Sequence, residues 1–119
     1  MGQKSLADIL PSALVRRNKV LLLELARKYI WWLTPEEALA YPVRVVAQVM
    51  NLGEFEDARR MTEALGERAL RAVVRRAEAG QFNERSWHYW HYRLGLAEPG
   101  GMPPLPIRRL PRRSEPAGL

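Results

Sequence analysis

The residues best suited to acid–base or metal chemistry are two histidines, His88 and His91, which stand three positions apart. On a helix that spacing lets both imidazoles face one metal ion. The sequence has no cysteine, and Glu84 is the nearest carboxylate, so no full set of metal ligands is present. Ser86 adjoins the histidines, but such close neighbours on a helix do not face each other as a nucleophile and base must.

Other catalytic patterns are also missing from the sequence. There is no glycine-rich phosphate loop and no paired-carboxylate motif. We therefore expect no metal site, no cofactor and no enzymatic activity, and we look to binding for the function.

Aromatic side chains are the second group with useful chemistry, and five of the ten lie between residues 82 and 96. On a helix they point in several directions, and a single core cannot receive every face. We expect one aromatic face to pack inward and another to stay available, because exposed Trp and Tyr are typical anchors of protein interfaces. The predicted partner-binding residues are Trp31, Trp87, Tyr89, Trp90 and Tyr92. The alternative is that the aromatic clusters simply pack on each other as core.

Basic residues form the third group, with 19 Lys and Arg against 13 Asp and Glu, a net charge of +6. Such a balance favours acidic partners, either nucleic acid or an acidic protein surface. The candidate phosphate-binding residues are Arg68, Arg71, Arg75 and Arg76 on one predicted helix, and Arg108, Arg109, Arg112 and Arg113 near the C-terminus. A solvated helix face and a solvated extension are the competing interpretations, and in either case we expect nucleic-acid binding to be weak.

Helical spacing of apolar residues dominates the first 97 residues, and no alternating strand is convincing. In the longest predicted helix, Trp31 projects onto an otherwise polar stripe and needs cover from another segment or a partner. The valine-rich stretch has strand propensity, but the spacing of Val46, Val49 and Met50 favours a helix. The predicted helices cover residues 17–33, a short stretch from 35, then 43–52, 54–65, 67–79 and 83–94.

Several boundaries of these helices carry recognisable signals. Thr34 and Glu37 form a capping box around Pro35. Asn83 is a good N-cap, and Phe82 and Trp87 occupy the positions of a hydrophobic staple. Each of four helices is followed by a glycine that fits its end, namely Gly53, Gly66, Gly80 and Gly95.

Composition changes after residue 97, because residues 98–119 hold six of the nine prolines. Proline resists helix formation, so we expect this tail to stay flexible and its removal to leave stability almost unchanged. The predicted fold is all-α: a compact bundle of about five to six short helices over residues 1–97. No apolar run reaches the length of a membrane span and no signal peptide is apparent, so we expect a cytoplasmic protein that does not contact a membrane.

Parts of residues 41–96 resemble a known bacterial family. The matching stretches are Tyr41 to Gly53, Glu56-Asp57, Leu70-Arg71, Phe82, Ser86 to Trp90, and Arg93 to Leu96. Together they are similar to small proteins encoded beside abortive-infection nucleotidyltransferase toxins of the AbiEii type. The resemblance implies an antitoxin-like partner of such a toxin, and it assigns no functional residues.

The sequence therefore favours a protein-binding function. We expect the chain to neutralise or regulate a nucleotidyltransferase toxin in a toxin–antitoxin or phage-defence pair, using aromatic anchors with arginine steering. The alternative is a small basic accessory protein that binds nucleic acid through its arginine-rich helix face and tail.

Overall fold

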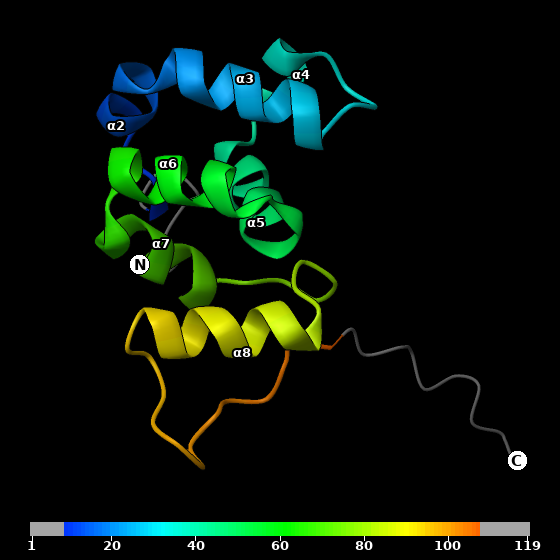
Figure 1. The fold of residues 1–119 in the computed structure, drawn as a ribbon. Helices are drawn as coiled ribbons and strands as arrows, with labels where there is room; N and C mark the ends of the chain where they lie inside the picture. The colour runs from blue at the N-terminus through cyan, green and yellow to red at the C-terminus, as the bar shows by residue number, and fades with distance from the viewer. Residues whose placement is uncertain (1–8, 108–119) are drawn as a thin grey trace, which may run out of the picture.

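The computed structural model describes residues 9–107, and within them the chain is helical, without a strand. Helices α2, α3 and the short α4 form one tier (Figure 1). A second tier consists of α5 and α6, and α7 and α8 lie beyond it. The helices are α2 (Ser12–Arg17), α3 (Lys19–Tyr29), α4 (Pro35–Leu39), α5 (Pro42–Leu52), α6 (Phe55–Leu65), α7 (Glu67–Arg75) and α8 (Glu84–Arg93). The predicted all-α fold is confirmed.

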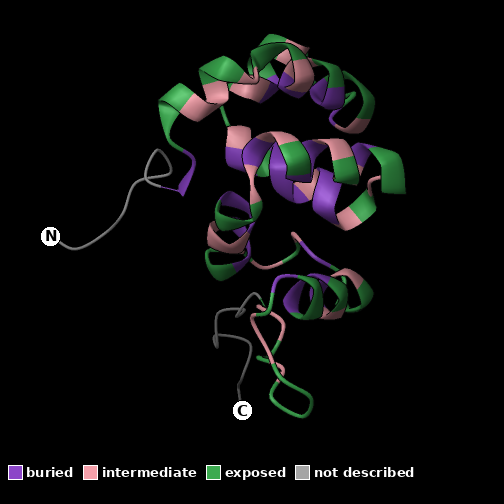
Figure 2. Ribbon diagram, turned by 60° about the vertical axis from the view of Figure 1, so that its left-hand side comes forward, coloured by how far each residue is buried: buried purple, intermediate pink, exposed green. Residues whose placement is uncertain are grey.

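Helix α5 is the centre of the bundle, because it contacts α3, α4, α6, α7 and α8. The valines that left its conformation ambiguous are buried on several sides of it, together with Ala47 and Met50. A helix that is apolar nearly all round belongs inside a protein, where packing outweighs the modest helix propensity of valine. Figure 2 shows the same pattern, with buried residues where the tiers face one another.

The predicted helix over residues 17–33 is wrong in extent. Asn18 interrupts it, and the amide Nδ2 of Asn18 donates to the carbonyl of Leu14 at 2.9 Å, a local bond that competes with the helical ladder. The helix then ends at Tyr29, so Trp31 stands in a turn and not on a helical stripe. The capping box is confirmed: Thr34 Oγ1 accepts from the amide of Glu37, whose carboxylate accepts from the amide of Thr34.

Helix α7 also ends earlier than predicted, at Arg75. The chain instead makes a turn from Glu78 to Gln81, closed by the amide of Gln81 donating to the carbonyl of Glu78 at 3.1 Å. Gly80 has a φ of 86° at the third position of this turn, a conformation that favours glycine. Gly80 thus serves a turn and does not close the helix.

A buried carboxylate joins α3 to α6. Asp57 accepts from Lys28 Nζ at 2.8 Å and from the hydroxyl of Tyr29 at 2.7 Å, and its side chain is only 11% exposed. The Tyr29 oxygen also accepts from the amide of Glu54 at 2.9 Å. Hydrogen bonds from Lys28 and then from Tyr29 lower the pKa of Asp57.

We expect this carboxylate to make the fold acid-sensitive. A group whose pKa is lower in the folded state stabilises the fold above its unfolded pKa of 3.8, and that stability is lost as pH falls through the folded value. Asp57→Asn should cost about 1–3 kcal/mol at pH 7 and should lose less further stability below pH 4 than the wild type. Thermal melts at pH 7 and pH 3 measure both effects, with the exposed Glu36→Gln as control. Parallel pH curves for wild type and Asp57→Asn would contradict the expectation.

The start of the predicted tail packs against the body, through residues 102–105. Met102 and Leu105 are partly buried on the core, and the indole Nε1–H of Trp87 donates to the carbonyl of Pro103 at 2.8 Å. Proline blocks a helix but leaves its carbonyl free to accept a hydrogen bond, which composition alone does not reveal.

The tail should therefore contribute to stability, but unevenly. Deleting residues 98–119 uncovers Trp87 and should lower the free energy of unfolding by about 1–3 kcal/mol, from lost apolar burial and one lost hydrogen bond. Deleting only residues 108–119 keeps these contacts, so this shorter truncation should have a higher melting temperature than the deletion of residues 98–119. Equal melting temperatures for the two truncations would show that the packing of 102–105 contributes nothing.

Candidate functional site: an apolar groove at the end of helix α5

Helix α8 is fixed to the C-terminal end of α5 by hydrogen bonds to carbonyls that the helix itself leaves free. Trp90 Nε1–H donates to the carbonyl of Met50 at 2.7 Å, and the hydroxyl of Ser86 donates to the carbonyl of Asn51 at 2.8 Å. The last carbonyls of a helix need such partners. A side chain at Gly53 would collide with the carbonyl oxygen of Val49, so the chain can leave α5 this closely only at a glycine.

The start of α8 is set by the two signals predicted for it. Asn83 Oδ1 accepts from the amide of Ser86 at 2.8 Å, and the rings of Phe82 and Trp87 lie 5.9 Å apart, which confirms the N-cap and the staple. These contacts determine the rotation of α8 about its axis and therefore which of its aromatic side chains face inward.

A groove lies between the end of α5, the start of α6 and the outer side of α8. Its hollow measures about 510 Å³ beside Met50 and Ser86 and continues along α6 toward Thr62. The rim consists of three large apolar side chains that are unusually exposed: Leu52 (56%), Phe55 (75%) and Tyr89 (49%). The buried Trp90 lines its floor, with the Tyr89 ring edge-on at 5.0 Å.

Arginines are the only charged residues among those that line this groove. They are Arg59, Arg85 and Arg93. Arg59 pairs with Glu56 and Glu63, and Arg93 pairs with Glu67 at 2.7 Å. Arg85 is exposed and forms no ion pair with the part of the chain that the structure describes.

The predicted partner-binding aromatics divide into two groups. Tyr89 and Tyr92 are about half exposed and Trp31 is 76% exposed, so these three are accessible. Trp87 and Trp90 are not accessible anchors, since they are 6% and 3% exposed and their indole N–H groups are bonded to backbone carbonyls. One aromatic face of α8 is thus buried and another is free, as the spacing predicted.

Of the three accessible residues among the predicted aromatics, only Tyr89 lines the groove. Tyr92 lies elsewhere on α8, and Trp31 stands in the turn after α3, edge-on to Trp32 at 5.5 Å between ring centroids. Leu52 and Phe55 are not among the predicted partner-binding residues, and Phe55 does not lie on the inward side of α6. The buried stripe of α6 runs through Asp57 and Met61 instead.

The histidines are not assembled into a reactive site. His91 is buried against Trp87, and its Nδ1–H donates to the carbonyl of that residue at 2.8 Å. His88 is partly buried, and Ser86 is used in the bond to α5. Across residues 9–107 no three His, Asp or Glu side chains gather closely enough to hold a metal ion.

The predicted arginine face of α7 is only partly free. Arg71 faces Glu67, four positions before it on the same helix, at 3.6 Å, whereas Arg68, Arg75 and Arg76 are exposed and have no ion pair within residues 9–107. The tail arginines 108, 109, 112 and 113 lie outside the described residues.

Comparison with known proteins adds nothing to this site. No protein-family model, curated protein or solved structure matches the chain. None of the helices in residues 9–107 has both the length and the apolar character needed to cross a membrane.

Proposed function

We propose that this protein is a non-enzymatic, antitoxin-like binding partner that uses the groove beside α8 to dock on another protein in the cytoplasm. The observation that carries the proposal is the exposure of Leu52, Phe55 and Tyr89 around a single hollow. Large apolar side chains left exposed together are a common mark of a protein-interaction surface. Aromatic anchors at the centre of an interface usually supply most of the binding energy.

The lining of the groove suggests the character of the partner. Because arginines are its only charged lining residues, an apolar segment with acidic flanks would complement it better than a basic one. The net charge of +6 attracts the same kind of surface over longer distances.

We propose a nucleotidyltransferase toxin as this partner. Support for that choice comes from the resemblance of residues 41–96 to small proteins encoded beside such toxins. An antitoxin of this kind would act by covering the toxin or its substrate-binding cleft.

The test begins with the neighbouring gene. If it encodes a nucleotidyltransferase, its expression alone should arrest growth, and co-expression with this chain should restore growth and yield a co-purifying complex. Growth arrest that this chain does not relieve, or the lack of such a neighbour, would contradict the toxin assignment.

Nucleic acid is the second candidate partner, and the exposed Arg68, Arg75 and Arg76 favour it. Binding through these side chains would weaken steeply with salt, because each phosphate contact releases counterions. Salt-sensitive retention on RNA or DNA, lost when these three arginines become Gln, would favour this candidate over the groove.

A further inference from the structure

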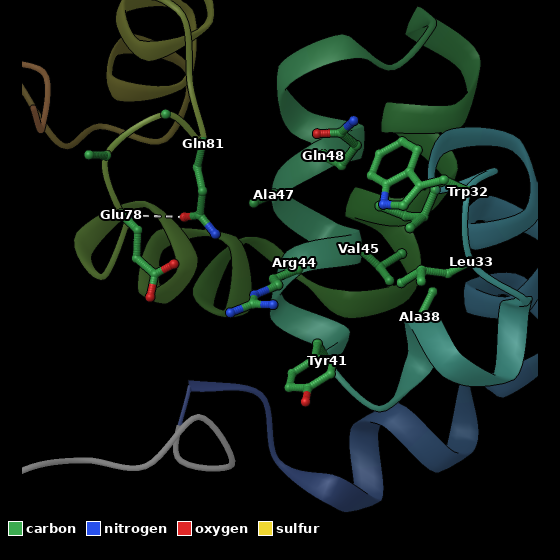
Figure 3. A pocket seen from close by; sticks show the side chains of 13 residues that line it. Trp32, Leu33, Ala38, Tyr41, Arg44, Val45, Ala47, Gln48, Glu78 and Gln81 are labelled. Carbon is green, nitrogen blue, oxygen red and sulfur yellow. Dashed lines mark hydrogen bonds between the residues drawn. The ribbon is translucent and has the colours of Figure 1, made fainter. Parts of the chain in front are cut away.

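A second hollow lies along α5. It measures about 480 Å³ and is formed by three separate parts of the chain: the α3–α4 turn with α4, the outer face of α5, and the turn before α8 (Figure 3). Figure 3 shows Trp32, Leu33 and Ala38 on one side and Glu78 and Gln81 on the other. Its volume lies within the usual range for small-molecule sites.

The floor and one wall of this pocket are apolar. Ile30, Ala38, Val45 and Ala47 are buried beneath it, and Trp32, which is 56% exposed, stands beside it. This arrangement suits a flat ring or a short branched chain, which would gain apolar burial against the floor and contact with the indole face.

One end of the pocket is electropositive. Arg44 lies over the ring of Tyr41 at 4.8 Å and has no ion pair within residues 9–107. Arg44 is in the first turn of α5, a helix of 11 residues that has no acidic residue in that turn and no side-chain cap at Tyr41. The positive end of the helix dipole therefore adds to the guanidinium charge and is not neutralised locally.

The other amide and carboxylate side chains that line the pocket are those of Gln48, Gln81 and Glu78. Gln81 Oε1 accepts from the backbone amide of Glu78 at 2.9 Å, which fixes the side chain and leaves its NH₂ group as a donor. Gln48, in the middle of α5, also lines the pocket, and its Nε2 donates to the carbonyl of Tyr29 at 3.4 Å. Glu78 lies on the same side of the pocket as Gln81. Its negative charge repels an anion, so it should weaken the binding of an anionic ligand.

From this geometry we infer a binding site for a small carboxylate with an apolar body, with the carboxylate at Arg44 and the apolar part beside Trp32. Such a ligand is either a free organic acid or the C-terminal residue of a peptide, which present the same chemistry. The site is separate from the groove, and its existence does not depend on the proposed toxin partner.

The experiment is a titration of the full chain with 3-phenylpropionate, followed by the ¹H–¹⁵N signal of the Trp32 indole. A Trp32→Phe variant assigns this signal. We expect a saturable shift with the acid and a clearly weaker one with 3-phenylpropionamide, which has the same apolar body without the charge. A tetrapeptide ending in phenylalanine distinguishes the two sources: tighter binding than the acid supports a peptide C-terminus, and weaker binding supports a free acid.

Two charge variants test the roles of the residues in opposite directions. Arg44→Gln should weaken binding of the acid by about tenfold, the value of one charge-assisted hydrogen bond, and leave the amide unaffected. Glu78→Gln should strengthen binding of the acid. Arg27→Gln is the matched control, because it removes the same charge from an exposed arginine that lines neither the pocket nor the groove, and it should change little.

The inference is overturned by any of three results. These are no shift of the Trp32 signal, equal binding of the acid and the amide, and equal losses for Arg44→Gln and Arg27→Gln. The last result would mean that only the net charge of the protein attracts the acid. Each substituted residue is exposed in the fold. A thermal melt of each variant checks that it remains folded.

Discussion

Phe55→Ala and Tyr89→Ala should each weaken the complex with the partner protein by at least about 30-fold while leaving the fold intact. Both side chains lie on the rim of the groove, where truncation removes contacts to a partner and few contacts within the chain. Losing a large anchor at an interface centre typically costs about 2–4 kcal/mol, which corresponds to a 30- to 1,000-fold change in affinity. Affinity of the purified variants for the proposed nucleotidyltransferase partner measures this effect.

Tyr92→Ala is the matched control for Tyr89→Ala. Both tyrosines lie on α8 and are about half exposed, but only Tyr89 lines the groove. We expect near wild-type affinity for Tyr92→Ala. Equal losses for the two tyrosines would place the interface on the outer face of α8 as a whole, and unchanged affinity for Phe55→Ala would remove the groove from the interface.

Trp90→Ala should destabilise the domain by about 3–5 kcal/mol, enough to unfold much of so small a protein. The indole is 3% exposed, and its N–H is the donor to the carbonyl of Met50 at the end of α5. The substitution opens a cavity and leaves that carbonyl without its partner. Chemical denaturation followed by circular dichroism measures the loss.

Trp90→Phe separates the two contributions. It keeps much of the aromatic volume but removes the indole N–H, so we expect an intermediate loss of about 1–3 kcal/mol. The neighbouring Tyr89→Ala should be close to wild type in stability. If Trp90→Ala were as stable as Tyr89→Ala, the packing of Trp90 between α8 and α5 would contribute nothing to the stability of the fold.

Local sequence signals predicted the parts of the fold that depend on a few consecutive residues. The capping box at Thr34, the cap at Asn83 and the staple between Phe82 and Trp87 all form, because each requires only side chains within one helical turn. The division of α8 into a buried and an exposed aromatic face also follows from helical periodicity alone.

Features that depend on distant segments were not predictable in this way. Asp57 is buried because Lys28 and Tyr29, almost 30 positions away, supply its hydrogen bonds. Trp87 is covered because a proline-rich segment folds back on it. The groove and the pocket each combine at least three segments, so neither leaves a local pattern in the sequence.

The central position of α5 has a consequence for how the chain acquires its structure during synthesis. The helices that enclose α5 precede it and follow it in the sequence. The carbonyls of Met50 and Asn51 at its end accept hydrogen bonds from side chains of α8. A nascent chain that has emerged only as far as Gly80 therefore carries an apolar helix with one side still open to solvent. We therefore expect folding to be completed only after α8 has left the ribosome, and until then α5 exposes an apolar side to chaperones and to other nascent chains.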